Sequence, residues 1–252
     1  MYSTYQSNNS LIYCINLQHR GDRKIHSYNE FRKIGISPNK VIYPPFVKDT
    51  RGGAYGCYDS HVKIWHNFFY KHPEYNYCLV FEDDFVAEPQ AKELLEKACK
   101  YVDKNVEQID LLILHHLCVP VGNNLNNEDF TNGYGFLTQA YIVTRPYIQS
   151  ILNKNQNKLP EPNGCHIDYL MNSVPTDLLY SKKIFYTKQK CFMQLLDKSD
   201  NYINKLDELF RKDAIERTQT IVNIAIFLRE KRLINDNGIK RFHRFVNKII
   251  NR

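Results

Sequence analysis

Three consecutive carboxylates, Glu82, Asp83 and Asp84, directly follow the apolar run Cys78–Phe81. Such a run is typical of a strand that is buried on both faces in a parallel sheet. Adjacent acids at its end repel one another, and a hard divalent cation such as Mn²⁺ or Mg²⁺ would compensate them. In an extended backbone, Glu82 and Asp84 point one way and Asp83 the other. The pattern predicts an acid-x-acid metal clamp, although a solvated loop after a strand would show the same residues.

Alternating strands and helices must position these acids. The sequence predicts strands at 11–17, 40–46, 77–81, 110–115, 135–144, 183–187 and 191–195. It predicts helices at 22–34, 57–70, 89–104, after Pro146 and around Asp168, with loops at 122–135 and 155–165. This alternation favours an α/β domain with a largely parallel sheet. Because ligands of such sheets gather beyond the carboxyl ends of the strands, the acids are expected at the binding edge.

Composition indicates a globular protein, since 43% of the 252 residues are hydrophobic and 24% are charged. The seven cysteines are dispersed without metal-binding spacing, so we expect small buried side chains in a reducing compartment. The polar start shows no secretory signal, and no apolar run approaches the length of a membrane span. A cytoplasmic protein is the expectation.

The net charge of +7 is concentrated near the C-terminus. Residues 201–252 hold 12 Lys/Arg and 6 Asp/Glu, which leaves 22 and 21 for residues 1–200. This balance argues against a nucleic-acid partner for the main body, which would need a basic face. We therefore expect a domain at 1–200 and a basic helical extension at 201–252.

Several segments, taken in order, resemble glycosyltransferase family 25, which includes bacterial lipopolysaccharide galactosyltransferases and collagen hydroxylysine galactosyltransferases. The segments are Ile15-Asn16-Leu17 with Arg20 and Arg23, Gly56-Cys57 with Ser60-His61, Val80–Asp84, Gly135–Val143, Ile167-Asp168, and Gln194 with Ser199-Asp200. The resemblance implies a GT-A fold, with a Rossmann-like nucleotide-binding half and an acceptor-binding half. It also implies a UDP-galactose or UDP-glucose donor, Mn²⁺ on the acid-x-acid motif, and inversion at the anomeric carbon.

The resemblance implies roles for four acids. Asp84 and Glu82 would hold the metal, which stabilises the leaving diphosphate by Lewis-acid action. Asp83 would contact the ribose or a donor hydroxyl. Asp168 matches a late aspartate of the family and is the candidate base for the acceptor hydroxyl, while a helix cap is its alternative role.

Ser60 and His61 fall in the first turn of a predicted helix, after Gly52, Gly53 and Gly56. A helix N-terminus attracts anions, and glycines let the backbone approach a ligand closely. These residues are candidates for the donor pocket. Packing of His61 against the sheet is the alternative.

Further candidates for donor binding follow other strands. Asn16, Arg20 and Arg23 come after the first strand, where base and ribose would lie in the implied fold, and arginine also pairs with phosphate. A solvated arginine on the helix is the alternative for Arg23. Thr138 and Gln139 are candidates for contacts to the sugar hydroxyls, and the alternative is that they are polar positions of a half-buried strand.

Several further residues are alternative candidates for metal or diphosphate contacts. Gln194, Asp200 and His166 are each candidates for a further metal or diphosphate contact. The pair His115-His116 is either a metal ligand set or, more commonly at a strand end, one buried and one exposed histidine.

Residues 239–252 predict a basic amphipathic helix, in which one stripe holds Ile239, Phe242, Val246, Ile249 and Ile250. Such a helix binds an anionic membrane surface, which would suit a lipid-linked acceptor, or packs on the domain. The leading hypothesis is an inverting, metal-dependent hexosyltransferase acting on a glycan, lipooligosaccharide or hydroxylysine-type acceptor. The alternatives are an inactive relative that binds nucleotide-sugar or glycan or assists a partner enzyme, and a membrane or nucleic-acid adaptor acting through the tail.

Overall fold

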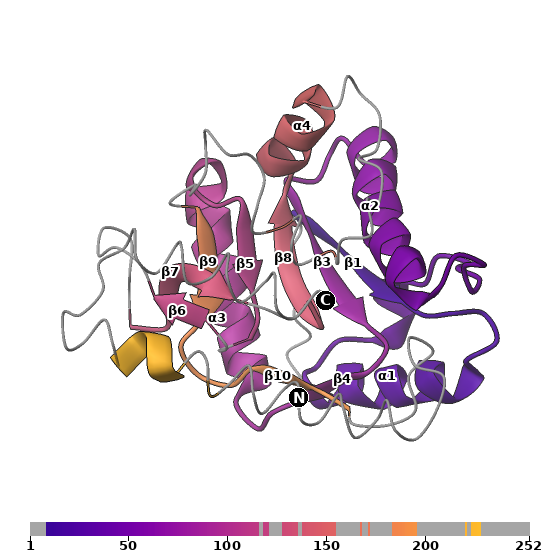
Figure 1. The fold of residues 1–252 in the computed structure, drawn as a ribbon, viewed down its shortest axis with the longest axis horizontal. Helices are drawn as coiled ribbons and strands as arrows, with labels where there is room; N and C mark the ends of the chain where they lie inside the picture. Colours follow the sequence, from indigo (N-terminus) through magenta and orange to yellow (C-terminus); the bar gives the residue numbers. More distant parts are fainter. Residues whose placement is uncertain are drawn as a thin grey trace.

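The computed structural model describes residues 9–115, 118–120, 128–135, 138–154, 183–195 and 223–227, together with 167, 171 and 220. Ten strands lie within these residues: β1 (Ser10–Ile15), β2 (Val41–Ile42), β3 (Tyr77–Glu82), β4 (Phe85–Ala87), β5 (Leu111–Ile113), β6 (Cys118–Pro120), β7 (Phe130–Gly135), β8 (Ala140–Thr144), β9 (Ile184–Thr187) and β10 (Phe192–Gln194). Eight of them form the central sheet in the order β2-β1-β3-β8-β5-β9-β7-β6, and β10 pairs with β4 (Figure 1).

Most strands at the centre of the sheet point in one direction. β1 is parallel to β2 and β3, β5 is parallel to β9, and β8 runs antiparallel between β3 and β5. β2, β1, β3, β5 and β9 therefore share a direction, and the carboxyl ends of β1 and β3 meet at one edge. The predicted α/β class with a largely parallel sheet is confirmed.

The segment that holds β7 and β8 differs from the sequence prediction. The loop predicted at 122–135 contains β7, and the strand predicted at 135–144 is described from Ala140 onward. β7 pairs antiparallel with β9, with Phe130 opposite Thr187, and β6 pairs with β7. Glycine and asparagine disfavour strands, but backbone pairing with a neighbour overrides this weak preference.

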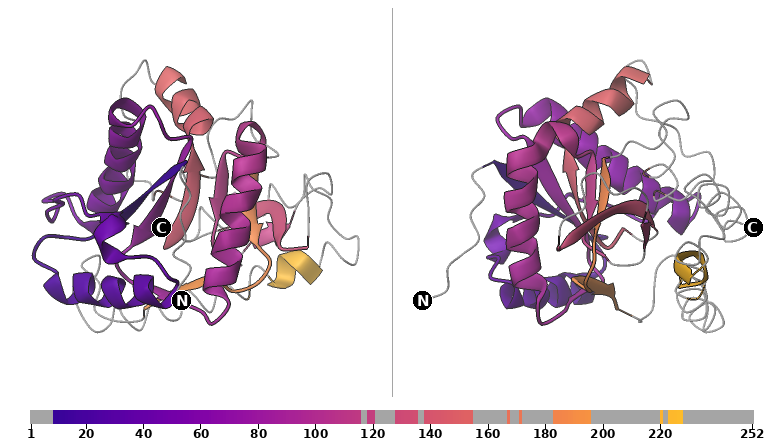
Figure 2. Two further views of the ribbon diagram at one scale, coloured as in Figure 1. Left: turned by 180° about the vertical axis from the view of Figure 1, so that it is seen from behind. Right: turned by 90° about the vertical axis from the view of Figure 1, so that its left-hand side faces the viewer.

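Helices cover both faces of the sheet (Figure 2). They are α1 (Gly21–Lys33), α2 (Gly53–Lys71), α3 (Ala91–Asn105) and α4 (Arg145–Lys154), with short 3-10 turns at Pro38–Lys40 and Val106–Gln108. Alternate residues of β3 enter two cores: Leu79 packs with α1 and α3, and Val80 packs with α2 and α4. β3 is therefore buried on both faces, as its apolar run predicted.

The acidic residues leave the sheet through a turn. Glu82 ends β3 opposite Ile15 of β1, and the chain turns at Asp83 and Asp84 before entering β4. The expectation of an extended backbone at 82–84 is therefore wrong. The chain must turn here to reach β4, and the amide of Asp83 donates to the carbonyl of Ile15 at 3.0 Å.

Helix α2 begins earlier than predicted, at Gly53 rather than near Cys57. Ser60 and His61 therefore lie beyond its first turn, and the prediction that they belong to that turn is wrong. Gly52 has a φ of 117°, a left-handed conformation that favours glycine. A Cβ at Gly56 would lie 3.1 Å from the Cβ of Asp49. The glycines therefore allow the 49–52 loop to fold closely over the first turn of the helix.

The cysteines of the described residues are thiols. Cys14, Cys78, Cys99, Cys118 and Cys191 are buried and Cys57 is half-buried, which confirms the prediction of small buried side chains for five of them.

Parts of the C-terminal region lie outside the described residues, including Cys165, His166, Asp168, Asp200 and the segment 239–252. In the extension, residues 220 and 223–227 are helical. None of the helices that the structure describes combines the length and apolar character that a membrane crossing requires.

Candidate functional site

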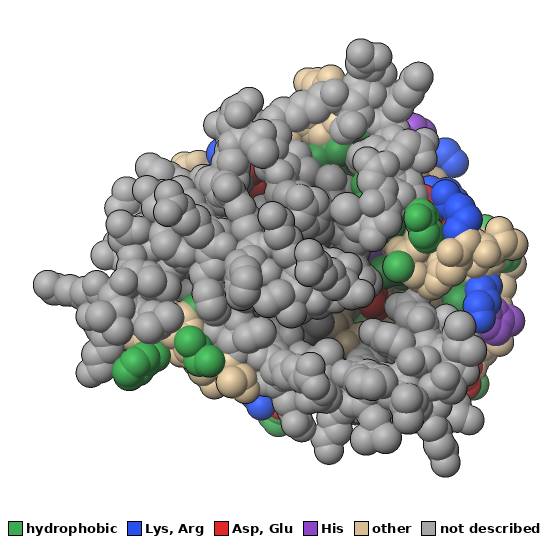
Figure 3. Space-filling view, viewed as in Figure 1, with side chains coloured by type: hydrophobic (Ala, Val, Ile, Leu, Met, Phe, Trp, Pro, Cys, Tyr) green, Lys and Arg blue, Asp and Glu red, His purple; other side chains and the backbone are tan. Residues whose placement is uncertain are grey.

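A pocket opens at the carboxyl ends of β1 and β3, where the acids were predicted to lie. One wall consists of Glu82, Asp83 and Asp84. The remaining lining includes three basic residues and the first turns of α2: Arg20, Arg23, Lys48, Gly53, Gly56, Cys57 and Ser60. Figure 3 shows acidic surface close to Lys and Arg side chains on the described part of this face. The pocket therefore presents carboxylates and cationic side chains to the same space.

Asp84 occupies the most buried end of the acidic wall, with 7% of its surface exposed. The guanidinium Nη1 of Arg23 lies 3.7 Å from its Oδ2, and the side chain of Arg23 is also buried. The amide Nε2 of Gln194 donates to the same oxygen at 3.0 Å. The structure thus brings Arg23, from α1, and Gln194, from β10, to one carboxylate. A buried carboxylate next to a buried guanidinium is a compensated charge.

Asp83 is held by Asn16. The Nδ2 of Asn16 donates to Oδ2 of Asp83 at 2.7 Å and to the backbone carbonyl of Arg20 at 3.0 Å. Burial raises the pKa of Asp83 to about 7, and the neighbouring carboxylates of Asp84 and Glu82 act in the same direction. The hydrogen bond from Asn16 and the charge of Arg23 partly oppose this rise in pKa. In the absence of a cation, Asp83 is therefore protonated in a large fraction of molecules near neutral pH.

Glu82 lies at the end of the wall nearest α2. The hydroxyl of Thr138 donates to its Oε1 at 2.6 Å, and Nε2 of His61 lies 3.5 Å from the same oxygen. The backbone amide of Glu82 donates to the carbonyl of Gln139 at 2.9 Å. Thr138 and Gln139 therefore position Glu82 in the structure.

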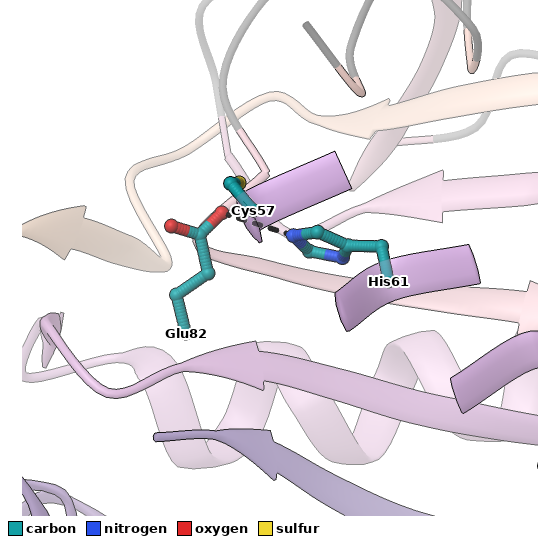
Figure 4. A group of neighbouring side chains, drawn as sticks. All are labelled: Cys57, His61 and Glu82. Carbon is teal, nitrogen blue, oxygen red and sulfur yellow. Dashed lines mark ion pairs between the residues drawn. The ribbon is translucent and has the colours of Figure 1, made fainter. Parts of the chain in front are cut away.

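His61 is fully buried and is oriented by two residues beneath it. Its Nδ1 lies 2.8 Å from the hydroxyl of Tyr141, which accepts a hydrogen bond from Nε1 of Trp65 at 3.0 Å. This arrangement turns Nε2 toward Glu82. Figure 4 shows His61 and Cys57, both on α2, beside the Glu82 carboxylate at the end of β3.

The structure places most of the residues predicted from the sequence in or next to the pocket. Arg20, Arg23, Ser60, Glu82, Asp83 and Asp84 line the pocket. Asn16, His61, Thr138 and Gln194 contact the acids directly. The side chain of Gln139 is buried, and the hydroxyl of Ser60 donates to the carbonyl of Gly56 at 2.7 Å. Asp168, His166, Asp200 and His116 lie outside the described residues, and His115 is buried.

Lys48, Asp49 and Cys57 line the pocket but were not predicted to do so. Lys48 and Asp49 belong to the loop that the glycines fold over α2, and nothing in their spacing indicated this. Cys57 precedes His61 by four residues on the same helix, and residues at that spacing share a helix face. That spacing was the available signal.

In this pocket, acids and arginines meet beyond the ends of the parallel strands β1 and β3, next to the N-terminus of α2. A site of this class suits a phosphorylated ligand together with a cation. Residues 48–171 match the model of glycosyltransferase family 25 (LPS biosynthesis protein). This match confirms the family resemblance over these residues, which are similar to glycosyltransferase family 25. No curated protein is detectably similar to the chain.

Solved structures with a similar arrangement include a glycosyltransferase and a protein in complex with UDP-GlcNAc. The glycosyltransferase is involved in the glycosylation of the major capsid of PBCV-1. Its sequence is 13% identical to this chain, and the match covers 82% of this chain and 99% of the other, with a TM-score of 0.43. The other structure is S. aureus TarS 1-349 in complex with UDP-GlcNAc. Its sequence is 14% identical to this chain, and the match covers 89% of this chain and 64% of the other, also with a TM-score of 0.43. Similarity at this level identifies no substrate.

Proposed function

We propose that this protein is an inverting, metal-dependent hexosyltransferase with a GT-A fold. It moves galactose or glucose from a UDP-sugar to a glycan, lipooligosaccharide or hydroxylysine-type acceptor. The observation that carries the proposal is a single pocket that is lined by both carboxylates and cationic side chains. A nucleoside diphosphate held with a divalent cation requires both.

The donor set of the acidic wall suits a hard cation. Glu82 and Asp84 both face the pocket and offer carboxylate oxygens, which Mn²⁺ and Mg²⁺ prefer. Such a cation, when bound, would stabilise the charge of the departing diphosphate. We assign Asp84 and Glu82 as its protein ligands and Asp83 as a contact to ribose or a donor hydroxyl. Gln194 and Thr138 would then act by fixing the two ligand carboxylates.

The basic residues of the pocket would bind the diphosphate and nucleoside. Arg20, Arg23 and Lys48 line the pocket, and guanidinium groups pair well with phosphate oxygens. The first turn of α2 adds backbone N–H groups that favour an anion. Arg23 would have two roles in this proposal, because it also compensates Asp84.

The base that removes the acceptor proton is assigned to Asp168 from the family resemblance, and this residue lies within the matched range 48–171. A positioned carboxylate base contributes roughly 10²–10⁴ in rate. Asp168→Asn should therefore lose transfer by that factor and keep its affinity for UDP, because the change removes the base but leaves the donor pocket. Transfer at the wild-type rate would refute the assignment.

A screen of nucleotide-sugars tests the proposed activity. Purified protein is incubated with UDP-galactose, UDP-glucose and other donors, with Mn²⁺ or with EDTA, and released UDP is measured. One UDP-hexose should dominate, and EDTA should abolish its turnover. Binding of a nucleotide-sugar without turnover would instead favour an inactive relative. Absence of both binding and turnover would refute the proposal.

The proposal also covers where the enzyme acts and which surface carries its acceptor. A basic amphipathic stripe at 239–252 supports a cytoplasmic enzyme that contacts a membrane surface carrying its acceptor. Removing residues 233–252 should abolish binding to anionic vesicles and leave donor turnover intact. Unchanged vesicle binding would refute the membrane role.

A further inference from the structure

A cluster of three potential metal ligands lies beside the acidic wall. Cys57, His61 and Glu82 each offer one ligand atom, and these atoms all lie within 4.8 Å of one another. Within the described residues, no other group of three or more His, Cys, Asp or Glu side chains brings its ligand atoms together in this way. We propose that Cys57, His61 and Glu82 bind a borderline divalent cation of the Zn²⁺ type on the wall of the pocket.

Helix α2 and strand β3 fix the relative positions of the three ligands. Cys57 and His61 are four residues apart on α2 and therefore lie on the same side of the helix, one turn apart. Glu82 approaches from the end of β3, so that the three ligands come from two rigid elements (Figure 4). Bond lengths in zinc sites place tetrahedral nitrogen and oxygen ligands about 3.3–3.5 Å apart. The observed separation between Nε2 of His61 and Oε1 of Glu82 is 3.5 Å.

The buried imidazole is a second, independent indication of a ligand. His61 is fully buried, and its Nε2 makes no hydrogen bond within the described part of the chain. The Nδ1 lies 2.8 Å from the Tyr141 oxygen, which also accepts from Trp65. Histidines that bind metals commonly donate their other N–H to an oxygen in this manner. The hydroxyl of Thr138 supports Glu82 in the same way.

The donor set determines which cation is favoured. A thiolate and an imidazole suit Zn²⁺ or Co²⁺ far better than Mn²⁺ or Mg²⁺, which prefer oxygen ligands. Binding requires that the Cys57 thiol release its proton to solvent, and no redox change is involved. Three protein ligands leave the fourth position for water or another oxygen, and Cys57 and Glu82 both line the pocket into which that position would open.

This site is distinct from the proposed clamp in chemistry and in two of its three ligands. Glu82 is common to both, so a Zn²⁺-type cation held by Cys57 and His61 would draw one carboxylate away from Asp84. The proposal does not depend on the transfer reaction, because binding is measured with protein and metal alone. Failure of the transferase proposal would therefore leave this inference standing, and the reverse is also true.

Cobalt spectroscopy tests the site directly. Co²⁺ added to metal-stripped wild-type protein should produce a thiolate-to-cobalt charge-transfer band, and stoichiometric Zn²⁺ should displace it. Cys57→Ser should lose the band and bind Zn²⁺ at least about 10-fold more weakly. Because Cys57 is half-buried, the serine variant should fold normally, and its circular dichroism spectrum checks this.

One variant serves as a control. His66→Gln changes an exposed histidine of the same helix and should leave the band and the Zn²⁺ affinity unchanged. Absence of the band in wild-type protein, or its persistence in Cys57→Ser, would overturn the proposal.

Discussion

The two ends of the acidic turn have contrasting surroundings. Asp84 is buried against the guanidinium of Arg23 and accepts a hydrogen bond from Gln194. Glu82 is half-buried beside a hydroxyl, an imidazole and a thiol. A carboxylate beside a buried guanidinium has its charge compensated by the fold, whereas one with polar neighbours gains more from an added cation. The contrast indicates that Asp84 anchors the turn and that Glu82 has the greater demand for a metal.

The largest expected effect comes from breaking the Asp84 end. Arg23→Gln leaves a buried carboxylate without its guanidinium, and losing one partner of a buried ion pair costs about 3–5 kcal/mol. Urea unfolding should show a loss of this size. Arg20→Gln is the matched control, because Arg20 pairs with the exposed Asp22 and such a pair contributes about 0–1 kcal/mol. Equal losses in the two variants would contradict the contrast between the two ends.

Asp83, between the two ends, should make stability depend on pH. Its pKa rises from 3.8 to about 7 on folding, so the native state keeps a proton that the unfolded chain has lost between these values. The free energy of unfolding should therefore fall as pH rises from about 4 to 7, by at most about 4 kcal/mol.

Asp83→Asn should remove this part of the pH dependence. The measurement is urea unfolding at several pH values in EDTA, which keeps cations from lowering the pKa of Asp83. An unchanged slope of stability against pH in the variant would contradict the assignment.

The smallest expected effect concerns the support of Glu82. Thr138→Val removes the 2.6 Å hydrogen bond to Oε1 while keeping the side-chain size. Loss of such an outer contact typically weakens metal binding by about 10-fold. The Mn²⁺ concentration for half-maximal donor hydrolysis should rise accordingly, and Thr138→Ser, which keeps the hydroxyl, should behave as wild type. A rise of the same size in both variants would show that the hydroxyl is not responsible.

Much of the core could be predicted from sequence, because long periodic segments determine it. The apolar run Cys78–Phe81 identified the buried strand β3 correctly, and the helix predicted at 57–70 forms most of α2. β7 was missed because its Asn and Gly residues have little strand preference, and its pairing with β9 and β6 makes it a strand. Local composition does not contain that long-range pairing.

The site was predicted in its residue types more fully than in its geometry. The acids and Arg23 were identified, but the ion pair between Arg23 and Asp84 depends on how α1 packs against the turn after β3. The helix spacing of Cys57 and His61 was an available signal that the sequence analysis did not use, and their approach to Glu82 depends on how α2 packs on the sheet. Packing of this kind is set by tertiary contacts that a single sequence does not reveal.

The central claim is that the acids at the end of β3 hold a cation against the diphosphate of a sugar nucleotide. Calorimetric titration with UDP, in Mn²⁺ and in EDTA, tests it most directly. Mn²⁺ should increase the affinity for UDP by at least about 10-fold in wild-type protein and by much less in Glu82→Gln and Asp84→Asn. Equal enhancement by Mn²⁺ in all three proteins, or none in the wild type, would contradict the claim.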